Sequence, residues 1–191
     1  MIGNDIVDIS LAAVQSNWRR RGFLDKLFIK AEIDLILNDE HSDMMLWRLW
    51  SMKESAYKAD YRLRKIRRFN PVKFRCEVSS ASCGEVRIGQ SVYETETMIH
   101  SDFIHTTAFM RSFRNNIDKH VLKGTQKNIN SQSLYQAILS HLALQIQCSK
   151  NDLVLTKSVE NIPEIFYHDQ KIQTLCSLSH HGSYGAFAIC H

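Results

Sequence analysis

The sequence predicts an α+β fold built from two small lobes, and three observations favour it. The chain has 191 residues, which fit one compact domain or two small lobes that share a core. Apolar residues make up 44% and charged residues 23%, a composition typical of a globular chain. In each half, helical spacing of apolar residues is followed by short strand-like runs. We therefore expect a single domain over 1–191, with lobe one at about 1–112 and lobe two at about 131–191.

The first half opens with a short run rich in Ile and Val, which predicts a strand at 2–9. Apolar residues at helical spacing then predict two helices, at about 18–37 and 44–66, and Pro71 ends the helical stretch. Runs with β-branched and aromatic residues, broken by Gly84 and Gly89, predict strands at 72–78, 85–93 and 103–110.

A polar stretch over 114–131 is the best candidate for a linker between the lobes. Ser131 or Ser133 is expected to cap a helix at 134–146. Four further runs predict strands at 153–159, 163–167, 172–178 and 184–190. The spacing of His100 and Ala108 recurs in His180 and Ala188, which indicates that the second half repeats the first.

Composition also narrows the class of protein. No run approaches the roughly 18 to 20 apolar residues that span a bilayer, and Asp5 and Asp8 stand where a signal peptide would be basic and then apolar. The five cysteines show no C-x-x-C spacing, so we interpret them as reduced thiols. We expect a soluble, cytoplasmic protein.

The formal net charge of +4 is too small to indicate a nucleic-acid binder by itself, but the cations are clustered. Trp18 precedes Arg19, Arg20 and Arg21, and five cations fall within 62–68. Such clusters are either solvated surface that complements a helix dipole or a surface for an acidic partner. A nucleic-acid-binding module in which Trp18 stacks on a base is the rival interpretation.

Trp50, Glu54 and Lys58 are spaced at i, i+4 and i+8, so they lie along one face of the second predicted helix. An exposed Glu–Lys pair would explain the last two. The surrounding aromatic residues instead indicate a half-buried helix, where a carboxylate needs a cation to offset its desolvation. Asp5, on the opening strand, is a candidate second carboxylate. Two carboxylates on separate elements form a hard oxygen site that suits Mg²⁺ shared with phosphates better than Zn²⁺.

The run 177–186 combines hydroxyls, two imidazoles and two glycines near a strand end. Such groups donate hydrogen bonds to an anion, so the run predicts a phosphate contact. The alternative is that these residues form an ordinary polar hairpin turn that binds no ligand. A zinc pair is disfavoured because His180 and His181 are neighbours on a strand and point to opposite faces, and no G-x-S-x-G elbow indicates a nucleophilic serine.

Three segments in this order resemble the 4′-phosphopantetheinyl transferase superfamily. They are Gly3-Asn4-Asp5-Ile6-Val7-Asp8, the pattern Trp50-x-x-Lys53-Glu54-x-x-x-Lys58, and Ser177-Leu178-Ser179-His180 with Ala186 and Ala188. Residues 23–28 with Glu32 resemble the helix after the family's first strand. No Walker loop, Rossmann fingerprint or kinase signature competes. The resemblance implies two pseudo-repeated small α/β lobes with antiparallel sheets.

The activity that the resemblance implies is Mg²⁺-dependent transfer of the phosphopantetheine arm of coenzyme A to a serine hydroxyl of an apo acyl or peptidyl carrier protein, releasing 3′,5′-ADP. Asp5 and Glu54 would bind Mg²⁺, and Lys58 would bind a diphosphate oxygen and stabilise developing charge. The serine proton would pass to Glu54 or to a metal-bound water.

The resemblance also implies contacts with coenzyme A. Ser179 and His180 would contact its nucleotide phosphates, and Lys53 would contact phosphate or the partner. Larger family members often carry a second acid where this chain has Val7, so a third protein ligand is not expected. The length favours a monomer in which lobe two replaces a neighbouring subunit and His180 faces lobe one across a cleft. A non-catalytic relative that only binds coenzyme A or a carrier protein is the alternative.

Overall fold

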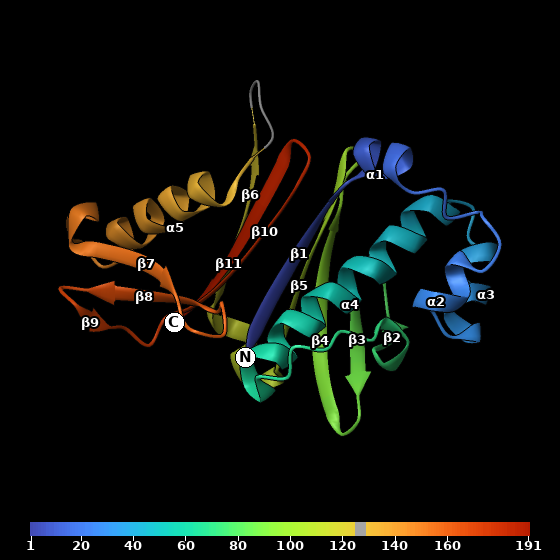
Figure 1. Cartoon of the computed structure of the whole chain (residues 1–191), viewed down its shortest axis with the longest axis horizontal. Helices are drawn as coiled ribbons and strands as arrows, with labels where there is room; N and C mark the ends of the chain where they lie inside the picture. The colour runs from blue at the N-terminus through green and yellow to red at the C-terminus, as the bar shows by residue number, and fades with distance from the viewer. Residues whose placement is uncertain (125–128) are drawn as a thin grey trace.

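The computed structural model describes residues 1–124 and 129–191, and these form two lobes that lie side by side (Figure 1). Helices and antiparallel sheets build both lobes, as predicted. Lobe one contains the elements up to β5, and lobe two contains those from β6 onward. No helix of the described ranges is both long and apolar enough to cross a membrane.

Lobe one is a five-stranded antiparallel sheet, in the order β1-β5-β4-β3-β2, with helix α4 packed on one face (Figure 1). Its strands are β1 (Ile2–Asp8), β2 (Arg75–Val78), β3 (Cys83–Ile88), β4 (Ser91–Ile99) and β5 (Phe103–Phe109). Its helices are α1 (Ile9–Gln15), α2 (Phe23–Leu27), α3 (Lys30–Asn38) and α4 (Ser42–Arg64), with the 3₁₀ turn η1 (Pro71–Lys73) after α4. A cluster of buried residues including Trp47, Leu49, Met52 and Phe74 forms the core between helix and sheet.

Helix α4 lies unusually close to β1 because position 3 has no side chain. A Cβ on Gly3 would lie 2.1 Å from the carbonyl oxygen of Ser55 and 2.7 Å from the backbone nitrogen of Ala59. Real Cβ atoms do not approach backbone so closely, so only glycine permits this packing. The close approach brings the β1 residues that face the helix next to the middle turns of α4.

Lobe two has two three-stranded antiparallel sheets, β10-β11-β6 and β7-β8-β9, and helix α5 (Figure 1). Its elements are β6 (Ile117–Lys123), α5 (Ser131–Gln145), β7 (Leu153–Lys157), β8 (Pro163–Tyr167), β9 (Gln170–Lys171), β10 (Leu175–His181) and β11 (Tyr184–Cys190), with the 3₁₀ turn η3 (Lys150–Asp152). The 3₁₀ turn η2 (Arg111–Asn116) connects β5 of lobe one to β6. Leu134, Ile138, Leu142 and Phe187 lie at the centre of its core.

The lobes meet along β1. Ile2 packs with Ala188 and Cys190, and Ile6 packs with Tyr184 and Ala186. Successive side chains of a strand alternate between its two faces. One face of β1 therefore packs on lobe two, while Gly3, Asp5 and Val7 face α4.

Several predicted elements differ from the observed ones. The helix predicted at 18–37 is instead α2 and α3, preceded by turns, because Gly22 adopts a left-handed φ of 75° and Ile29 is extended. Helix α1 was not predicted, and Asp8 caps it by accepting a hydrogen bond from the backbone N–H of Leu11. The strand predicted at 85–93 covers parts of β3 and β4, which reverse at Gly89 with a φ of 56°.

The linker predicted at 114–131 is wrong for most of its length. Residues 117–123 form β6, which pairs with β11, and its weak alternation between polar and apolar residues explains why it read as a loop. Positions 125–128 of that prediction lie outside the described residues. Asn130, not Ser131 or Ser133, caps α5, since its side chain accepts from the backbone N–H of Ser133. The strand predicted at 153–159 ends two residues earlier, as β7, and the strand predicted at 172–178 begins and ends three residues later, as β10.

Candidate active site between the lobes

A pocket of about 450 Å³ opens beside β1 and α4 and is bordered by the end of β10. Its polar lining includes Asp5, Glu54, His180 and His181. Its apolar wall comes from Phe23 and Leu27 of α2 and from Trp47 and Trp50 of α4. The structure therefore brings three of the residues singled out in the sequence, Asp5, Glu54 and His180, to one pocket.

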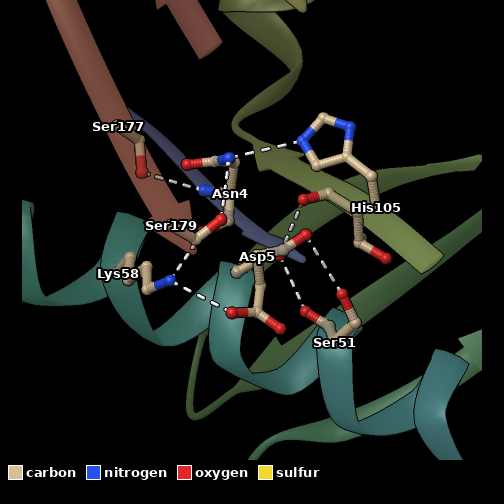
Figure 2. Close-up of polar contacts among 9 residues, drawn as sticks. Asn4, Asp5, Ser51, Lys58, His105, Ser177 and Ser179 are labelled. Carbon is tan, nitrogen blue, oxygen red and sulfur yellow. Dashed lines mark hydrogen bonds and ion pairs between the residues drawn. The ribbon is translucent and has the colours of Figure 1, made fainter. Parts of the chain in front are cut away.

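Asp5 projects from the middle of β1 toward α4, where Lys58 meets it (Figure 2). The Lys58 ammonium donates to the carbonyl oxygen of Asn4 at 2.8 Å and lies 3.2 Å from Oδ1 of Asp5. A lysine ammonium has three N–H donors, so one remains for an anion. The Lys58 side chain is 31% exposed, so an anion can reach it.

Glu54 lies one helical turn before Lys58 and, like Asp5, lines the pocket, whereas Lys58 lines a neighbouring one. Burial and, to a smaller extent, the nearby charge of Asp5 raise the pKa of its carboxyl to about 7, while Lys58 opposes the shift. Among the hydrogen bonds of the described residues, none reaches the Glu54 side chain. A buried carboxylate beside a second carboxylate is costly unless a cation joins them.

The donors at the pocket fit a magnesium ion. Both are carboxylates on separate elements, and hard oxygen donors suit Mg²⁺ and not a soft metal. Within 1–124 and 129–191, no group of three or more His, Cys, Asp or Glu residues is placed to hold a metal ion. Val7, where a further acid was considered, is buried in the lobe-one core. Asp5 and Glu54 are the carboxylates that line this pocket.

Strand β10 contributes Ser179 and His180 to different surroundings. His180 is exposed, lines the pocket and has Ser131 Oγ 3.5 Å from its Nε2. Ser179 is 7% exposed, and its hydroxyl oxygen accepts from Nδ2 of Asn4 at 3.1 Å. His180 is thus available to a ligand. Ser179 instead bonds to Asn4 of β1 and so joins the two lobes (Figure 2).

Lys53 does not reach the pocket. Its side chain is fully buried on another face of α4, and its ammonium lies 2.8 Å from Glu32 Oε2 and also donates to the carbonyl oxygens of Pro71 and Phe74. All three N–H donors are therefore used inside lobe one. The contact with phosphate or partner that the resemblance implied for Lys53 has no support in this geometry, and Lys53 instead connects α3, α4 and the segment before β2.

In the structure, several residues of the two basic clusters, 18–21 and 62–68, are held by contacts within the protein. Trp18 is 5% exposed and donates its indole N–H to Asp43, so it is not available to stack on a base. Arg19 pairs with the same carboxylate. Arg62 is turned inward and donates to the carbonyl oxygens of Cys176 and Pro163 in lobe two. Arg20 lies over the ring of Phe23, 5.4 Å from its centroid, and Phe23 lines the pocket.

A polar network behind Asp5 was missed in the sequence (Figure 2). Asn4 is fully buried, its backbone N–H donates to Ser177 Oγ at 2.9 Å, and its side chain lies 3.3 Å from Nε2 of His105. Burial lowers the pKa of His105 to about 4, with smaller contributions from Lys119 and Lys58, so the ring is neutral. The available signal was the position of Asn4, a polar residue between Ile2 and Ile6 on the same face of the strand.

Comparison with known proteins places the chain in a family. The model of the 4′-phosphopantetheinyl transferase superfamily matches residues 1–122, so the chain belongs to that superfamily. It is similar to the holo-[acyl-carrier-protein] synthase of Thermotoga maritima, with 12% identity and a TM-score of 0.44 over 73% of this chain and 89% of that one. It is also similar to the Helicobacter pylori holo-[acyl-carrier-protein] synthase in complex with coenzyme A, with 16% identity and a TM-score of 0.28 over 100% and 98%. No curated protein matches the sequence.

Proposed function

We propose that this protein transfers the 4′-phosphopantetheine arm of coenzyme A to a serine hydroxyl of an apo acyl or peptidyl carrier protein and releases 3′,5′-ADP. Membership of the superfamily supports the reaction class. Asp5 and Glu54 line one pocket and Lys58 is held 3.2 Å from the Asp5 carboxylate, and this arrangement supports assigning the reaction to this site. The serine oxygen would form a bond to the phosphorus that carries the pantetheine arm, and the bond from that phosphorus to the bridging oxygen would break.

Each residue has a role that its surroundings support. Lys58 binds an oxygen of the diphosphate with its remaining N–H and stabilises the charge that develops on the leaving group. His180 contacts a phosphate of the nucleotide from the other lobe. Glu54, which lines the pocket beside Asp5, takes the serine proton directly or through a water.

The reaction is proposed to depend on Mg²⁺ held by Asp5 and Glu54. When bound, the ion would neutralise charge on the diphosphate. The two carboxylates supply hard oxygen ligands and leave other positions open for water and phosphate.

We further propose that residues 1–191 act as one domain and as a monomer, because lobe two already supplies His180 to the pocket of lobe one. The basic residues near Phe23 would meet an acidic carrier protein. All five cysteines are free thiols, which supports a reducing compartment such as a cytoplasm.

The deciding experiment incubates the protein with coenzyme A, Mg²⁺ and candidate apo carrier proteins and seeks the phosphopantetheine adduct by mass spectrometry. The Asp5→Asn and Glu54→Gln variants should fold and give no adduct, and excess chelator should abolish the wild-type reaction. Asp25→Asn, at an exposed position of α2, is the matched control and should keep full activity. A wild-type protein that binds coenzyme A but modifies none of a broad set of carriers would favour the non-catalytic alternative.

A further inference from the structure

The β10–β11 turn is attached to lobe one by a set of hydrogen bonds that centre on Asp8. This residue ends β1, three positions after Asp5, and is only 3% exposed. Its side chain lies on the opposite face of the strand from Asp5, so it does not enter the metal site. Buried carboxylates need partners, and those of Asp8 come from both lobes.

The two carboxylate oxygens of Asp8 serve different lobes. Oδ1 accepts from the backbone N–H of Leu11 at 3.1 Å and from the hydroxyl of Ser10 at 2.7 Å, which caps α1. Oδ2 accepts from the backbone N–H of Ser183 at 3.0 Å. Ser183 lies in the turn that follows His180 and His181. One side chain therefore connects the start of α1 to the lobe-two border of the pocket.

A second hydrogen bond between the lobes has its donor in lobe one and its acceptor in lobe two. The backbone N–H of Asp8 donates to Nδ1 of His181 at 3.0 Å. Because a backbone N–H only donates, Nδ1 must accept, and the ring proton of the neutral imidazole lies on Nε2. Nε2 is 3.2 Å from Oε1 of Gln15, which accepts a hydrogen bond from the Nε2–H group. His181 is thus fixed by two groups of lobe one.

Gly182 shows how tightly the turn is held. It has a φ of 56°, and a Cβ at this position would lie 2.4 Å from Oδ2 of Asp8. A side chain there is excluded both by the backbone conformation and by the carboxylate. Among residues 1–124 and 129–191, the one hydrogen-bond contact of the His180 side chain is the 3.5 Å contact with Ser131, and its backbone pairs with Gly185. Its position at the pocket therefore depends on its neighbours.

We propose that Asp8, His181 and Ser183 form an interlobe latch that holds the 180–183 turn, and with it His180, at the pocket between the lobes. Asp8 is a positioning residue in this scheme and does not touch the substrate. The functional half of the inference rests on the proposed function, because it takes His180 as a contact of coenzyme A.

Amide hydrogen exchange tests the latch without any activity. Asp8→Asn keeps an oxygen for the α1 cap, since Asn caps helices as well as Asp, but places an N–H donor or a less basic oxygen toward Ser183. The amide of Ser183 should then exchange faster, and the amide of Asp8 should exchange faster in His181→Ala. Exchange that stays unchanged in both variants would overturn the latch.

Binding of coenzyme A, measured by calorimetry without carrier protein, tests whether the latch positions His180 for the ligand. Asp8→Asn, His181→Ala and Gly182→Ala should each weaken binding by about tenfold, the effect of losing one charge-assisted hydrogen bond. In kinetics, the KM for coenzyme A should rise more than kcat falls. In a His180→Ala background the same changes should cost less than about twofold, because the contact they position is already gone.

Asp102→Asn is the matched control. Asp102 lies in the β4–β5 turn and accepts from the Tyr184 hydroxyl at 3.1 Å, so it also joins the lobes, but it does not line the pocket. Its replacement should leave the affinity for coenzyme A unchanged. If Asp8→Asn weakens coenzyme A binding equally in the wild type and in the His180→Ala background, the positioning role is overturned. If the wild type binds no coenzyme A, the proposed function fails, and hydrogen exchange alone then decides whether the latch exists.

Discussion

The Lys58 ammonium lies 3.2 Å from Oδ1 of Asp5, and this pair joins the strand and the helix that form the floor of the pocket. The same ammonium donates to the carbonyl oxygen of Asn4. Lys58 is therefore held in place before any ligand arrives. A preorganised charge stabilises a transition state without reorganisation at the moment of reaction.

Lys58→Ala should lower turnover by on the order of 10² to 10³ while the protein stays folded. The measurement is kcat for carrier modification, with thermal unfolding to check the fold. Lys26→Ala, which removes an exposed cation from α2, is the control and should leave kcat unchanged. Wild-type kinetics for Lys58→Ala would make the lysine only an ion-pair partner of Asp5.

Lys53, five residues earlier in α4, should behave in the opposite way. Lys53→Met leaves Glu32 charged, buried and without its cation, which costs about 3–5 kcal/mol of unfolding free energy. The double variant Lys53→Met with Glu32→Gln should be less destabilised than the sum of the single changes. Urea unfolding measures all three. A stable Lys53→Met protein with weakened coenzyme A binding would restore the phosphate contact that the resemblance implied.

The contrast between these lysines shows what the sequence could predict. Helical spacing placed Glu54 and Lys58 on one face, and strand alternation separated Asp5 from Asp8, because both periods follow from local geometry. Which faces of α4 become buried depends on how segments distant in the sequence pack against the helix. Lys53 is buried because Glu32 and the carbonyl groups at Pro71 and Phe74 surround it, and spacing alone gives no sign of these partners.

The same reasoning explains the fold. Strand β1 and helix α4 were predicted to within two residues because their patterns are strong and uninterrupted. Strand β6 was missed because it is half-buried on both faces, so its stability comes from pairing with β11 and not from its own alternation. The contacts of the latch could not be predicted from the sequence either, because Asp8 and His181 are distant in sequence and meet only where the lobes pack.

Glu54 should make the stability of the metal-free protein depend on pH. Its folded pKa of about 7 is above its ordinary value, so the folded state binds the proton more tightly than the unfolded state. The stability from Glu54 is fully present below pH 4.5 and is lost as pH rises through about 7.

At pH 8 and without divalent cations, Glu54→Gln should be about 1–3 kcal/mol more stable than the wild type, and at pH 4 the two should agree. Chemical unfolding across this range measures the difference. Adding Mg²⁺ should stabilise the wild type and have little effect on Glu54→Gln. Equal pH profiles for the two proteins would contradict a pKa of Glu54 raised by burial and by the nearby charge of Asp5.

The docking of a carrier protein should depend on Arg20 and Arg21. Arg20 packs on Phe23 at the pocket border, whereas Arg19 is paired with Asp43 and Arg62 is turned into lobe two. An acidic carrier approaching a negative diphosphate is repelled, so cations near the pocket would both steer the encounter and offset that repulsion.

Reversing Arg20 and Arg21 to Glu should therefore raise the KM for the carrier protein by about ten- to a hundredfold, and the effect should grow as salt is lowered. The affinity for coenzyme A should stay nearly constant. The matched control reverses Arg67 and Arg68, in the segment after α4, and should have a smaller effect. Both constants are measured at two ionic strengths. If only coenzyme A binding weakens, Arg20 and Arg21 contact the phosphates of the nucleotide, and the carrier protein docks on another surface.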